Sequence, residues 1–354
     1  MGNLSAMLFA ALRDMQWRRR RLVIAIISTG LIFAMTLVLI GLSNGFRVEA
    51  QRSVDSLGVD TFVIKSGAAG PFLGATPFAE AELGLIQNAT GADAVPLACA
   101  ASTVVEGSSR RNVTVFGAPG PGLGMPHMSE GQAPSAPDEV AVSSTLDRHI
   151  GDQIRVGARD LKVVGIVPNS TALAKTPNIF LTTRGVQILS FNGQPIISSI
   201  AIKGTPQHLP GGYQTADRAA GVTDLLRPVK VAFGSLTIVA GLMSIVAVLI
   251  VGSVVYLSAL ERLRDFAVFK AIGVPTRSIL AGLALQAVIV ALLAAVLGVL
   301  FSLVLGPMFP MLVVIPMYGY LGLPLAAIFI GLLASVAGFR RAVAVDPALA
   351  FGGP

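Results

Sequence analysis

The stretch "VAFGSLTIVAGLMSIVAVLIVGSVVYLSAL", residues 231–260, contains no Asp, Glu, Lys or Arg in 30 consecutive positions. Two further runs are equally free of charge, residues 22–46 over 25 positions and residues 278–339 over 62. Because a helix of roughly 20 apolar residues crosses the hydrocarbon core of a bilayer, each of the shorter runs predicts one membrane span. The chain as a whole is 53% hydrophobic and 13% charged, which also favours lipid as part of its solvent.

The third run is too long for one span, since it would extend about 93 Å as a single helix. Gly306, Pro307, Pro310 and Pro316 mark the place where it turns back. We therefore expect four spans, at residues 22–46, 229–260, 278–305 and 319–339, with a short outer loop at residues 306–318.

The charges predict how these spans are oriented. Residues 1–21, 261–277 and 340–354 together hold 11 basic and 4 acidic residues, whereas residues 47–230 hold 15 of each sign. The positive-inside rule then places both termini and the 261–277 segment in the cytoplasm, with residues 47–228 facing out. The net charge of +7 is explained by this topology, so no nucleic acid is expected as a partner.

The two ends of the chain are expected to meet the inner membrane surface. The apolar residues of segment 1–21 recur at the spacing of one helix face, which predicts an amphipathic helix in the inner leaflet of the bilayer. The residues assigned to the membrane interface are Trp17, Arg18, Arg19, Arg20, Arg21, Arg340 and Arg341. A simple anchor for the first span remains as good an interpretation of the first segment as a docking role.

The sequence pattern of residues 47–228 is typical of an α+β domain. Short apolar–polar alternations predict strands at residues 60–66, 113–118, 138–144, 152–156, 161–167, 178–183 and 198–204. One short helix is expected from Thr76, with Pro77 at its first position, and another from Ser144 to Gly151. Cys99 is the only cysteine, so this domain must be held by its own core.

Catalytic and metal motifs are weak. "GLSNG", residues 41–45, matches the serine-nucleophile pattern formally, but it follows an apolar span where a strand is required. The three histidines share no metal-ligand spacing, and no phosphate-loop motif for ATP is present, so neither a metal nor a nucleotide is expected on this chain. The three charge-free runs contain no Asp, Glu, Lys, Arg or His, which argues against an ion-coupled carrier.

The segment between the second and third spans, residues 261–277, is the strongest functional candidate. As a helix it pairs Glu261 with Arg264 and Arg262 with Asp265, and it leaves Leu263, Phe266, Val268 and Phe269 to pack elsewhere. Gly273 can end this helix and Pro275 can open the next. Topology alone needs only basic residues, so the interleaved acidic and aromatic residues favour a docking surface for another protein.

These residues resemble the signature of FtsX/MacB-type ABC transporter permeases. "ERLRDFAVFKAIG" supplies Glu261, Arg262, Arg264, Asp265, Lys270, Ala271 and Gly273 at matching places, with one extra hydrophobic position around Phe266–Phe269. "RRAVAVDPALAF", residues 340–351, resembles the closing motif of the family, and residues 138–167 are similar to its periplasmic core, with Gly151, Asp152 and Gly165 at the expected positions.

The resemblance implies a non-catalytic permease subunit in a bacterial plasma membrane. Its partners would be a separate cytoplasmic ATPase that binds ATP and Mg²⁺, a second copy or a related permease, and the lipid bilayer; a periplasmic adaptor would also fit. The ATPase-coupling residues it implies are Glu261, Arg262, Arg264, Asp265, Phe269, Lys270, Ala271 and Gly273. The chain would then be an exporter or would transmit movement to its outward domain.

Two alternatives stay open. The first is an FtsX-like regulator without a transported substrate, whose outward domain acts on a cell-envelope partner such as a hydrolase. The second is a membrane hydrolase that uses Ser43 as its nucleophile, for which Ser43→Ala would abolish activity.

Overall fold

Residues 19–106, 109–261 and 263–343 are described by the computed structural model. They form two compact units, each with its own interior. The helical unit takes its described residues from before Gly45 and after Val231, and the mixed unit is Gly45–Val231. Residues 1–18, 107–108, 262 and 344–354 lie outside this description, and with them most of the expected amphipathic helix and the end of the expected cytoplasmic tail.

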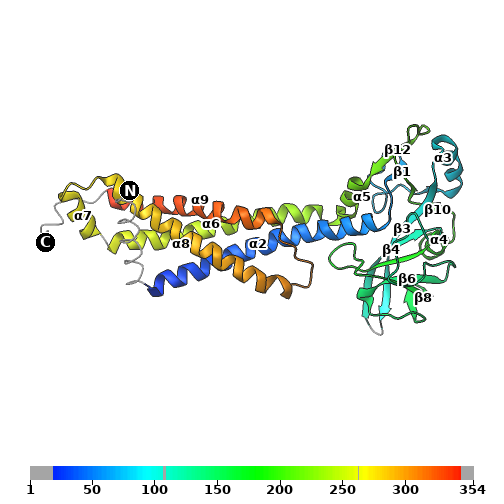
Figure 1. Ribbon diagram of the computed structural model, residues 1–354, viewed down its shortest axis with the longest axis horizontal. Coiled ribbons are helices and arrows are strands. Elements are labelled where there is room, and N and C mark those ends of the chain that lie inside the picture. The colour runs from blue at the N-terminus through cyan, green and yellow to red at the C-terminus, as the bar shows by residue number, and fades with distance from the viewer. Residues whose placement is uncertain (1–18, 107–108, 262, 344–354) are drawn as a thin grey trace. The chain divides into compact units, whose positions relative to one another are not determined.

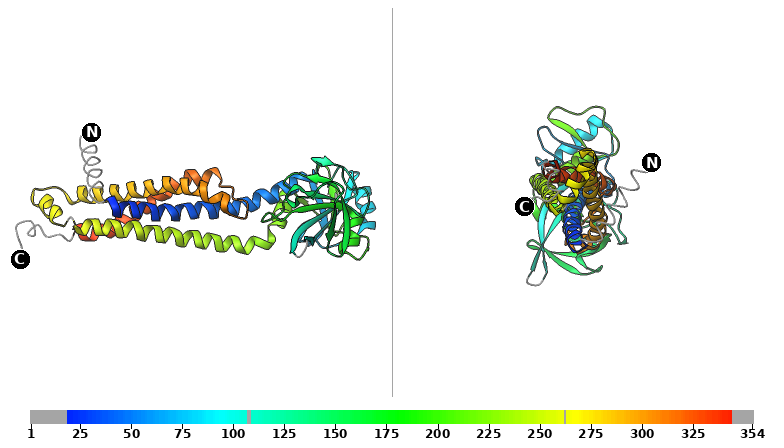
Figure 2. Two further views of the ribbon diagram at one scale, coloured as in Figure 1. Left: turned by 90° about the horizontal axis from the view of Figure 1, so that it is seen from below. Right: turned by 90° about the vertical axis from the view of Figure 1, so that its left-hand side faces the viewer.

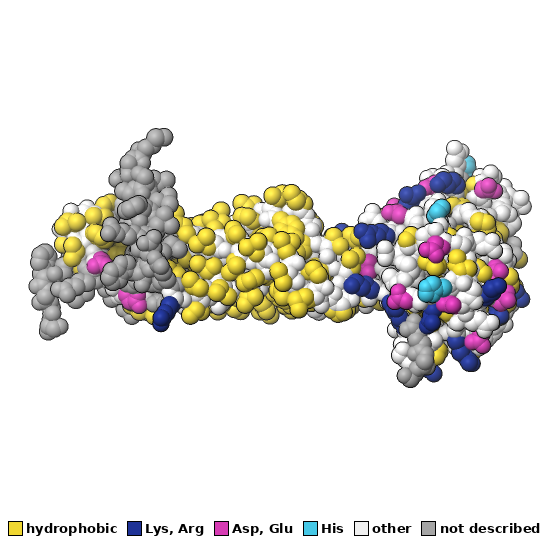
Figure 3. All heavy atoms as spheres, turned by 60° about the horizontal axis from the view of Figure 1, so that its bottom comes forward, with side chains coloured by type: hydrophobic (Ala, Val, Ile, Leu, Met, Phe, Trp, Pro, Cys, Tyr) yellow, Lys and Arg dark blue, Asp and Glu magenta, His cyan; other side chains and the backbone are white. Residues whose placement is uncertain are grey.

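Among the described residues, four long helices are apolar enough to cross a membrane. They are α2 (Arg19–Ser56), α6 (Lys230–Glu261), α8 (Thr276–Leu305) and α9 (Met317–Val343). Within the helical unit they lie side by side, and hydrophobic side chains cover its visible surface (Figures 1, 2 and 3). The expected four spans with an α+β domain inserted between the first and second are confirmed.

Small residues let these helices approach closely. Ala291, Ala294 and Ala295 of α8 are buried against Phe33 of α2 and Ala327 of α9. Lipid tails are as apolar as leucine, so helix association in a bilayer depends on such close packing. The backbones of α8 and α9 come close at Gly331 of α9, where an added Cβ would lie 2.8 Å from the Cα of Val288.

Gly331→Ala is therefore expected to destabilise the helical unit by about 1–3 kcal/mol, because the backbone of α8 must move to admit one methyl group. The thermal unfolding midpoint of the full chain in lipid nanodiscs measures this effect. Gly322→Ala is the matched control, since Gly322 lies on the same helix and an added Cβ there would meet nothing within 4 Å. Equal midpoints for the two variants would contradict the packing described for α8 and α9.

The mixed unit is built on a sheet of ten strands among the described residues. These are β1 (Thr61–Lys65), β3 (Ala94–Glu106), β4 (Ser109–Ala118), β5 (Glu130–Gly131), β6 (Glu139–Ser143), β7 (Gln153–Val156), β8 (Arg159–Val167), β9 (Asn178–Thr182), β11 (Ser199–Ile202) and β12 (Tyr213–Asp217). A second sheet pairs β2 (Phe78–Ala79) with β10 (Ile196–Ile197). The helical elements are η1 (Glu80–Glu82), α3 (Leu83–Thr90), η2 (Ser144–Leu146), α4 (Thr183–Ser190), α5 (Arg218–Leu225) and η3 (Arg227–Val229).

Part of the large sheet closes on itself. Strand β3 pairs with β4, β4 with β9, β9 with β6, β6 with β8, β8 with β7, and β7 again with β3. Inward-facing aliphatic side chains fill this ring, among them Val104, Val115, Val142 and Leu161. Closure pairs the edges of these strands, which protects them from pairing with other chains.

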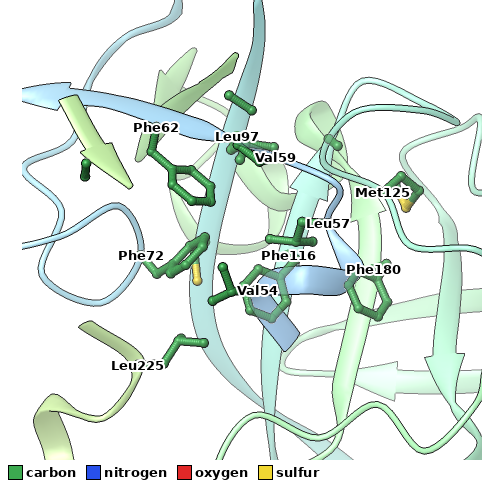
Figure 4. Packing of buried hydrophobic residues seen from close by; sticks show 14 of the residues in the cluster. Val54, Leu57, Val59, Phe62, Phe72, Leu97, Phe116, Met125, Phe180 and Leu225 are labelled. Atoms are coloured by element: carbon green, nitrogen blue, oxygen red, sulfur yellow. The ribbon is translucent and has the colours of Figure 1, made fainter. Parts of the chain in front are cut away.

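Strands β12, β1 and β11 extend the sheet from β3 and separate two further clusters. Phe62 of β1 belongs to the cluster that also contains the end of α2 and the end of α5, whereas its neighbour Val63 belongs to the cluster beneath α3. Figure 4 shows Phe62, Phe72, Phe116 and Phe180 in the first cluster, next to Val54 and Leu57 at the end of α2. The last turns of the first long helix are thus part of the core of the mixed unit.

The expected strands are all found, but other local expectations are wrong. No helix begins at Thr76; the chain first forms β2 and η1, and α3 begins at Leu83. The helix expected from Ser144 is the single turn η2, because Asp147 adopts a left-handed conformation with φ 49°. The expected positions Gly151 and Asp152 instead form a turn, in which the Asp152 carboxylate accepts a hydrogen bond from the His149 backbone amide.

A polar contact ties β1 to β12 and η1. The Lys65 ammonium lies between the Glu82 carboxylate and the Tyr213 hydroxyl, and it also sits over the Tyr213 ring at 4.4 Å from the ring centroid. The hydrogen bond from Lys65 lowers the pKa of Glu82 below its ordinary value, with a further contribution from the Tyr213 hydroxyl.

Because the folded pKa of Glu82 is depressed, its contribution to stability is present above the unfolded value near 4.5 and is lost as the pH falls through the folded value. Glu82→Gln is expected to destabilise the mixed unit by about 1 kcal/mol at neutral pH and to have no such effect at the lowest pH measured. Thermal unfolding of both forms between pH 3 and 7 measures this, and a difference that grows on acidification would contradict it.

Candidate functional site

The segment between α6 and α8 forms helix α7 (Leu263–Ala271), in the place where the sequence predicts a helix. The helix ends just before the glycine that the sequence predicts as its C-terminal cap. Gly273 has φ 88°, the Gly273 amide donates to the Lys270 carbonyl, and the Val274 amide donates to the Phe269 carbonyl at 2.8 Å. Pro275 is extended and immediately precedes the first residue of α8. Glycine and proline together therefore separate the two helices.

One face of α7 is anchored in the helical unit. The side chains of Phe266 and Ala267 are buried, with exposed fractions of 5% and 0%. They lie in one cluster with Val255 of α6, Ile279 of α8 and Ala334 of α9. Through this face, α7 therefore packs against three of the long helices.

The other face of α7 is exposed. Val268, Phe269 and Ile272 have exposed fractions of 43%, 44% and 71%. Of the apolar residues that the sequence leaves to pack elsewhere, Phe266 packs within the helical unit, whereas Val268 and Phe269 stay exposed. We call these three residues, with the exposed Ala271, the α7 apolar patch.

Charged residues flank this patch. Asp265 and Glu261 are exposed and Lys270 is partly buried. Arg262 and the side chain of Arg264 lie outside the described residues, so the two ion pairs expected from the sequence stay predictions. An apolar centre bordered by charges is the ordinary composition of a protein–protein interface.

The residues assigned to the membrane interface are described only in part. Arg20 is exposed at the start of α2, and Arg340 and Arg341 fall in the last turns of α9. Trp17, Arg18 and the side chains of Arg19, Arg21, Arg340 and Arg341 lie outside the described residues. Their role at the membrane surface stays a prediction.

The serine-nucleophile interpretation of "GLSNG" is wrong, because residues 41–45 lie inside the continuous helix α2 and form no strand-to-helix turn. The segment has another use. The Gly41 carbonyl accepts a hydrogen bond from the Val314 amide, and the Asn44 side chain donates to the Val314 carbonyl, both at 2.9 Å. Gly41 is needed for this approach, since an added Cβ would lie 2.7 Å from side-chain carbons of Val313 and Ile315.

Two buried carboxylates of the mixed unit were not anticipated as structural residues. Glu49 of α2 is 2% exposed and accepts hydrogen bonds from the Thr171 hydroxyl and the Lys175 amide. Asp224 of α5 is 1% exposed and accepts from the amides of Phe72 and Gly74, both at 2.7 Å. A signal for Glu49 existed in the sequence, because Phe46, Glu49, Ala50, Ser53, Val54 and Leu57 recur at the spacing of one helix face.

In the part of the chain that the structure describes, no three His, Cys, Asp or Glu side chains lie close enough to hold a metal ion. Cys99 is buried, and burial raises the pKa of its thiol far above the ordinary value. This thiol is therefore not a reactive group.

Comparisons with known proteins match both units. Residues 22–211 match the model of the MacB-like periplasmic core domain, and residues 237–347 match the model of the FtsX-like permease C-terminal region. The chain belongs to the FtsX/MacB-type family of ABC transporter permeases. An ABC transporter permease of Mycobacterium bovis and one of Mycobacterium tuberculosis are each 70% identical to this permease over 349 residues, which is 98% of this chain and 100% of theirs.

Among solved structures, the extracellular domain of the noncanonic ABC-type transporter YknZ from Gram-positive bacteria is 14% identical, covers 45% of this permease and 99% of its own chain, and has a TM-score of 0.32. The family identifies this permease as a multi-pass membrane protein that works with a partner ATPase. The family recognised from the sequence signature is thereby confirmed.

Proposed function

We propose that this permease transmits the ATP cycle of a separate cytoplasmic ATPase to its outward domain, and that α7 is the docking site for that ATPase. The observation that carries the proposal is the division of α7 into a buried and an exposed face. Phe266 and Ala267 join it to α6, α8 and α9, while Phe269 and Ile272 remain exposed to a partner. A helix of this kind can receive a contact on one side and pass a displacement on through the other.

The charge distribution supports the orientation. Residues 261–277 carry the basic excess typical of cytoplasmic segments, as do the two termini, and the mixed unit has balanced charge. We therefore place both termini and α7 in the cytoplasm and the mixed unit outside the bacterial plasma membrane. The permease itself is proposed to be non-catalytic and to bind no cofactor, so ATP and Mg²⁺ belong to the ATPase.

The active assembly is proposed to contain two permease subunits, either identical or related. Four helices per chain offer few surfaces to enclose a path, and the outer half of α6 supports this view, because Ile238, Leu242 and Ile245 are all more than half exposed. A symmetric pair would cover such faces. A periplasmic adaptor is a further partner that this arrangement allows.

The double variant Arg262→Glu with Arg264→Glu tests the docking site. Reversing two charges at an interface is expected to lower copurification with the ATPase at least tenfold. Arg110→Glu with Arg155→Glu is the matched control, because both arginines are exposed on the mixed unit. Unchanged copurification of the first variant would overturn the assignment of α7.

The same complex separates an exporter from a regulator of an envelope partner. In an exporter, a transported compound raises the ATPase rate of the reconstituted complex. In a regulator, the rate responds to an envelope protein such as a hydrolase or its coiled-coil adaptor. The exporter form of the proposed function is excluded if only the protein partner has this effect.

A further inference from the structure

The mixed unit contains an open pocket of about 450 Å³ that no sequence motif indicates. Its lining comes from β3, β4, the turn before β9, the loop after β1, and the junction of α5 with η3. None of the lining side chains is charged. Aliphatic side chains dominate, and the polar ones are Ser, Thr and Asn, which is the usual composition of a site for an apolar ligand with a small polar group.

One wall of this pocket is attached to α2. Leu173 and Thr176 line the pocket and close a tight turn, in which the Thr176 amide donates to the Leu173 carbonyl at 2.8 Å. Between them, Ala174 and Lys175 have φ values of 52° and 58°, a conformation that is unfavourable for residues other than glycine. The turn is held by Glu49 of α2, which accepts from the Lys175 amide at 3.1 Å.

Ser53, one helical turn after Glu49, adds a second attachment. Its hydroxyl donates to the Thr171 carbonyl at 2.8 Å and accepts from the side-chain amide of Asn178 at 2.9 Å. Four groups in and beside the turn thus hydrogen-bond to Glu49 and Ser53: the Thr171 hydroxyl, the Thr171 carbonyl, the Lys175 amide and the Asn178 side-chain amide. The position of the turn therefore depends on the position of α2. Any movement of the last turns of α2 within the mixed unit would move Leu173 and Thr176.

Another wall is attached to the segment that leads into α6. Leu225 and Pro228 line the pocket, and Pro228 lies two residues before Lys230, where α6 begins. Leu73, which is 44% exposed, belongs to the loop that Asp224 holds through the Phe72 and Gly74 amides. The pocket is thus bounded by two segments, each continuous with a different membrane-spanning helix.

We propose that this pocket binds the acyl chain of a membrane amphiphile. The uncharged lining excludes a charged ligand group, since a charge there would lose its hydration without gaining a partner. The chain also places the pocket close to the bilayer. Pro228 is three residues before Val231, the first residue of the apolar run, so the two are at most roughly 11 Å apart along the chain.

Because the two walls are attached to different long helices, ligand binding is coupled to the positions of those helices. A ligand that fits only one separation of the walls stabilises the corresponding arrangement of α2 and the α5–α6 junction. That arrangement in turn raises the affinity for the ligand by the same factor. This inference rests on the proposed function, in which movement of the long helices is driven by the ATPase. Binding itself needs no ATPase and can be measured separately.

The test uses the full-length permease in phosphatidylcholine nanodiscs with a palmitic acid that carries a photoreactive diazirine in mid-chain. After irradiation, labelled peptides are identified by mass spectrometry. The proposal predicts labelling within residues 101–114 and 171–176 that excess palmitic acid removes. Labelling confined to the spans, or pocket labelling that palmitic acid does not compete, would overturn it.

Ala101→Phe is designed to fill the pocket, because Ala101 is an exposed residue of its lining. It is expected to reduce the pocket label at least fivefold and to leave the label on the spans unchanged. Ala89→Phe is the matched control, since Ala89 is exposed on α3 and lies outside the pocket. Leu73→Asp provides a second variant at an exposed position and should give the same loss.

Copurification with the ATPase distinguishes the two proposals. Ala101→Phe should bind the ATPase as the unmodified permease does, because the pocket and α7 lie in different units. Equal pocket labelling of Ala101→Phe and the unmodified permease, with copurification intact, would overturn the amphiphile pocket and leave the docking site standing. Loss of copurification in that variant would contradict the separation of the two sites.

Discussion

Replacing Phe269 with aspartate is expected to weaken binding of the ATPase by about 30-fold or more. Phe269 is the aromatic residue of the α7 apolar patch, and its side chain is 44% exposed before any partner binds. Truncating a central aromatic residue of an interface costs about 2 kcal/mol or more, and a carboxylate buried against apolar groups adds to that cost. Because 1.4 kcal/mol corresponds to a factor of ten in affinity, the combined effect exceeds one order of magnitude.

The dissociation constant of the purified ATPase for the permease in nanodiscs measures this effect. Leu85→Asp is the matched control, because Leu85 is 53% exposed on α3 of the mixed unit and the substitution introduces the same charge. It is expected to leave the affinity unchanged. An affinity for Phe269→Asp within twofold of the control would mean that the α7 apolar patch is not part of the interface.

Replacing Asp224 with alanine is expected to destabilise the mixed unit by about 2–4 kcal/mol. The substitution leaves the buried Phe72 amide and the partly buried Gly74 amide without an acceptor, and an unsatisfied buried donor costs about 1–3 kcal/mol. It also opens a void against Gly70, where an added Cβ would lie 2.2 Å from the Asp224 carboxyl carbon. The loop at residues 70–74 should become the first site of proteolysis.

Asp217→Ala is the control for this prediction. Asp217 caps the same helix by accepting from the Ala220 amide, but its side chain is exposed, so the loss is expected to be about 1 kcal/mol. Chemical unfolding followed by protease susceptibility of the mixed unit compares the two variants. Equal destabilisation would show that Asp224 contributes no more than an ordinary helix cap.

The spans could be predicted from the sequence because membrane helices depend on local composition. An uncharged run of sufficient length is both necessary and visible, and Gly273 and Pro275 separate α7 from α8 as their backbone preferences require. Strand β3 was not predicted, although it is the strand that joins the ring to the rest of the sheet. Its sequence "AVPLACAASTVVE" is rich in alanine and has few β-branched residues before its last positions, so its pairing depends on its neighbours.

The functional residues also divide into those that local sequence predicts and those that depend on tertiary contacts. The α7 helix is a local feature and was predicted, whereas the exposure of Phe269 depends on how the helix rests on α6, α8 and α9. The partners of Glu49 and Asp224 lie more than 100 residues away in the chain, so no local pattern identifies them. The pocket whose walls are held by Glu49 and Asp224 forms only in the tertiary structure, so the sequence does not predict it.

The proposed function depends on α7 as the point of contact with the ATPase, and photo-crosslinking from Ile272 tests this contact most directly. Ile272 is 71% exposed, so benzoylphenylalanine can replace it without disturbing the buried face of α7. We expect irradiation of the complex to join position 272 to the ATPase, and no crosslink from the same residue placed at Leu293, which is 45% exposed on α8 within the apolar run. A complex that forms normally but gives no crosslink from position 272 would contradict docking of the ATPase on α7.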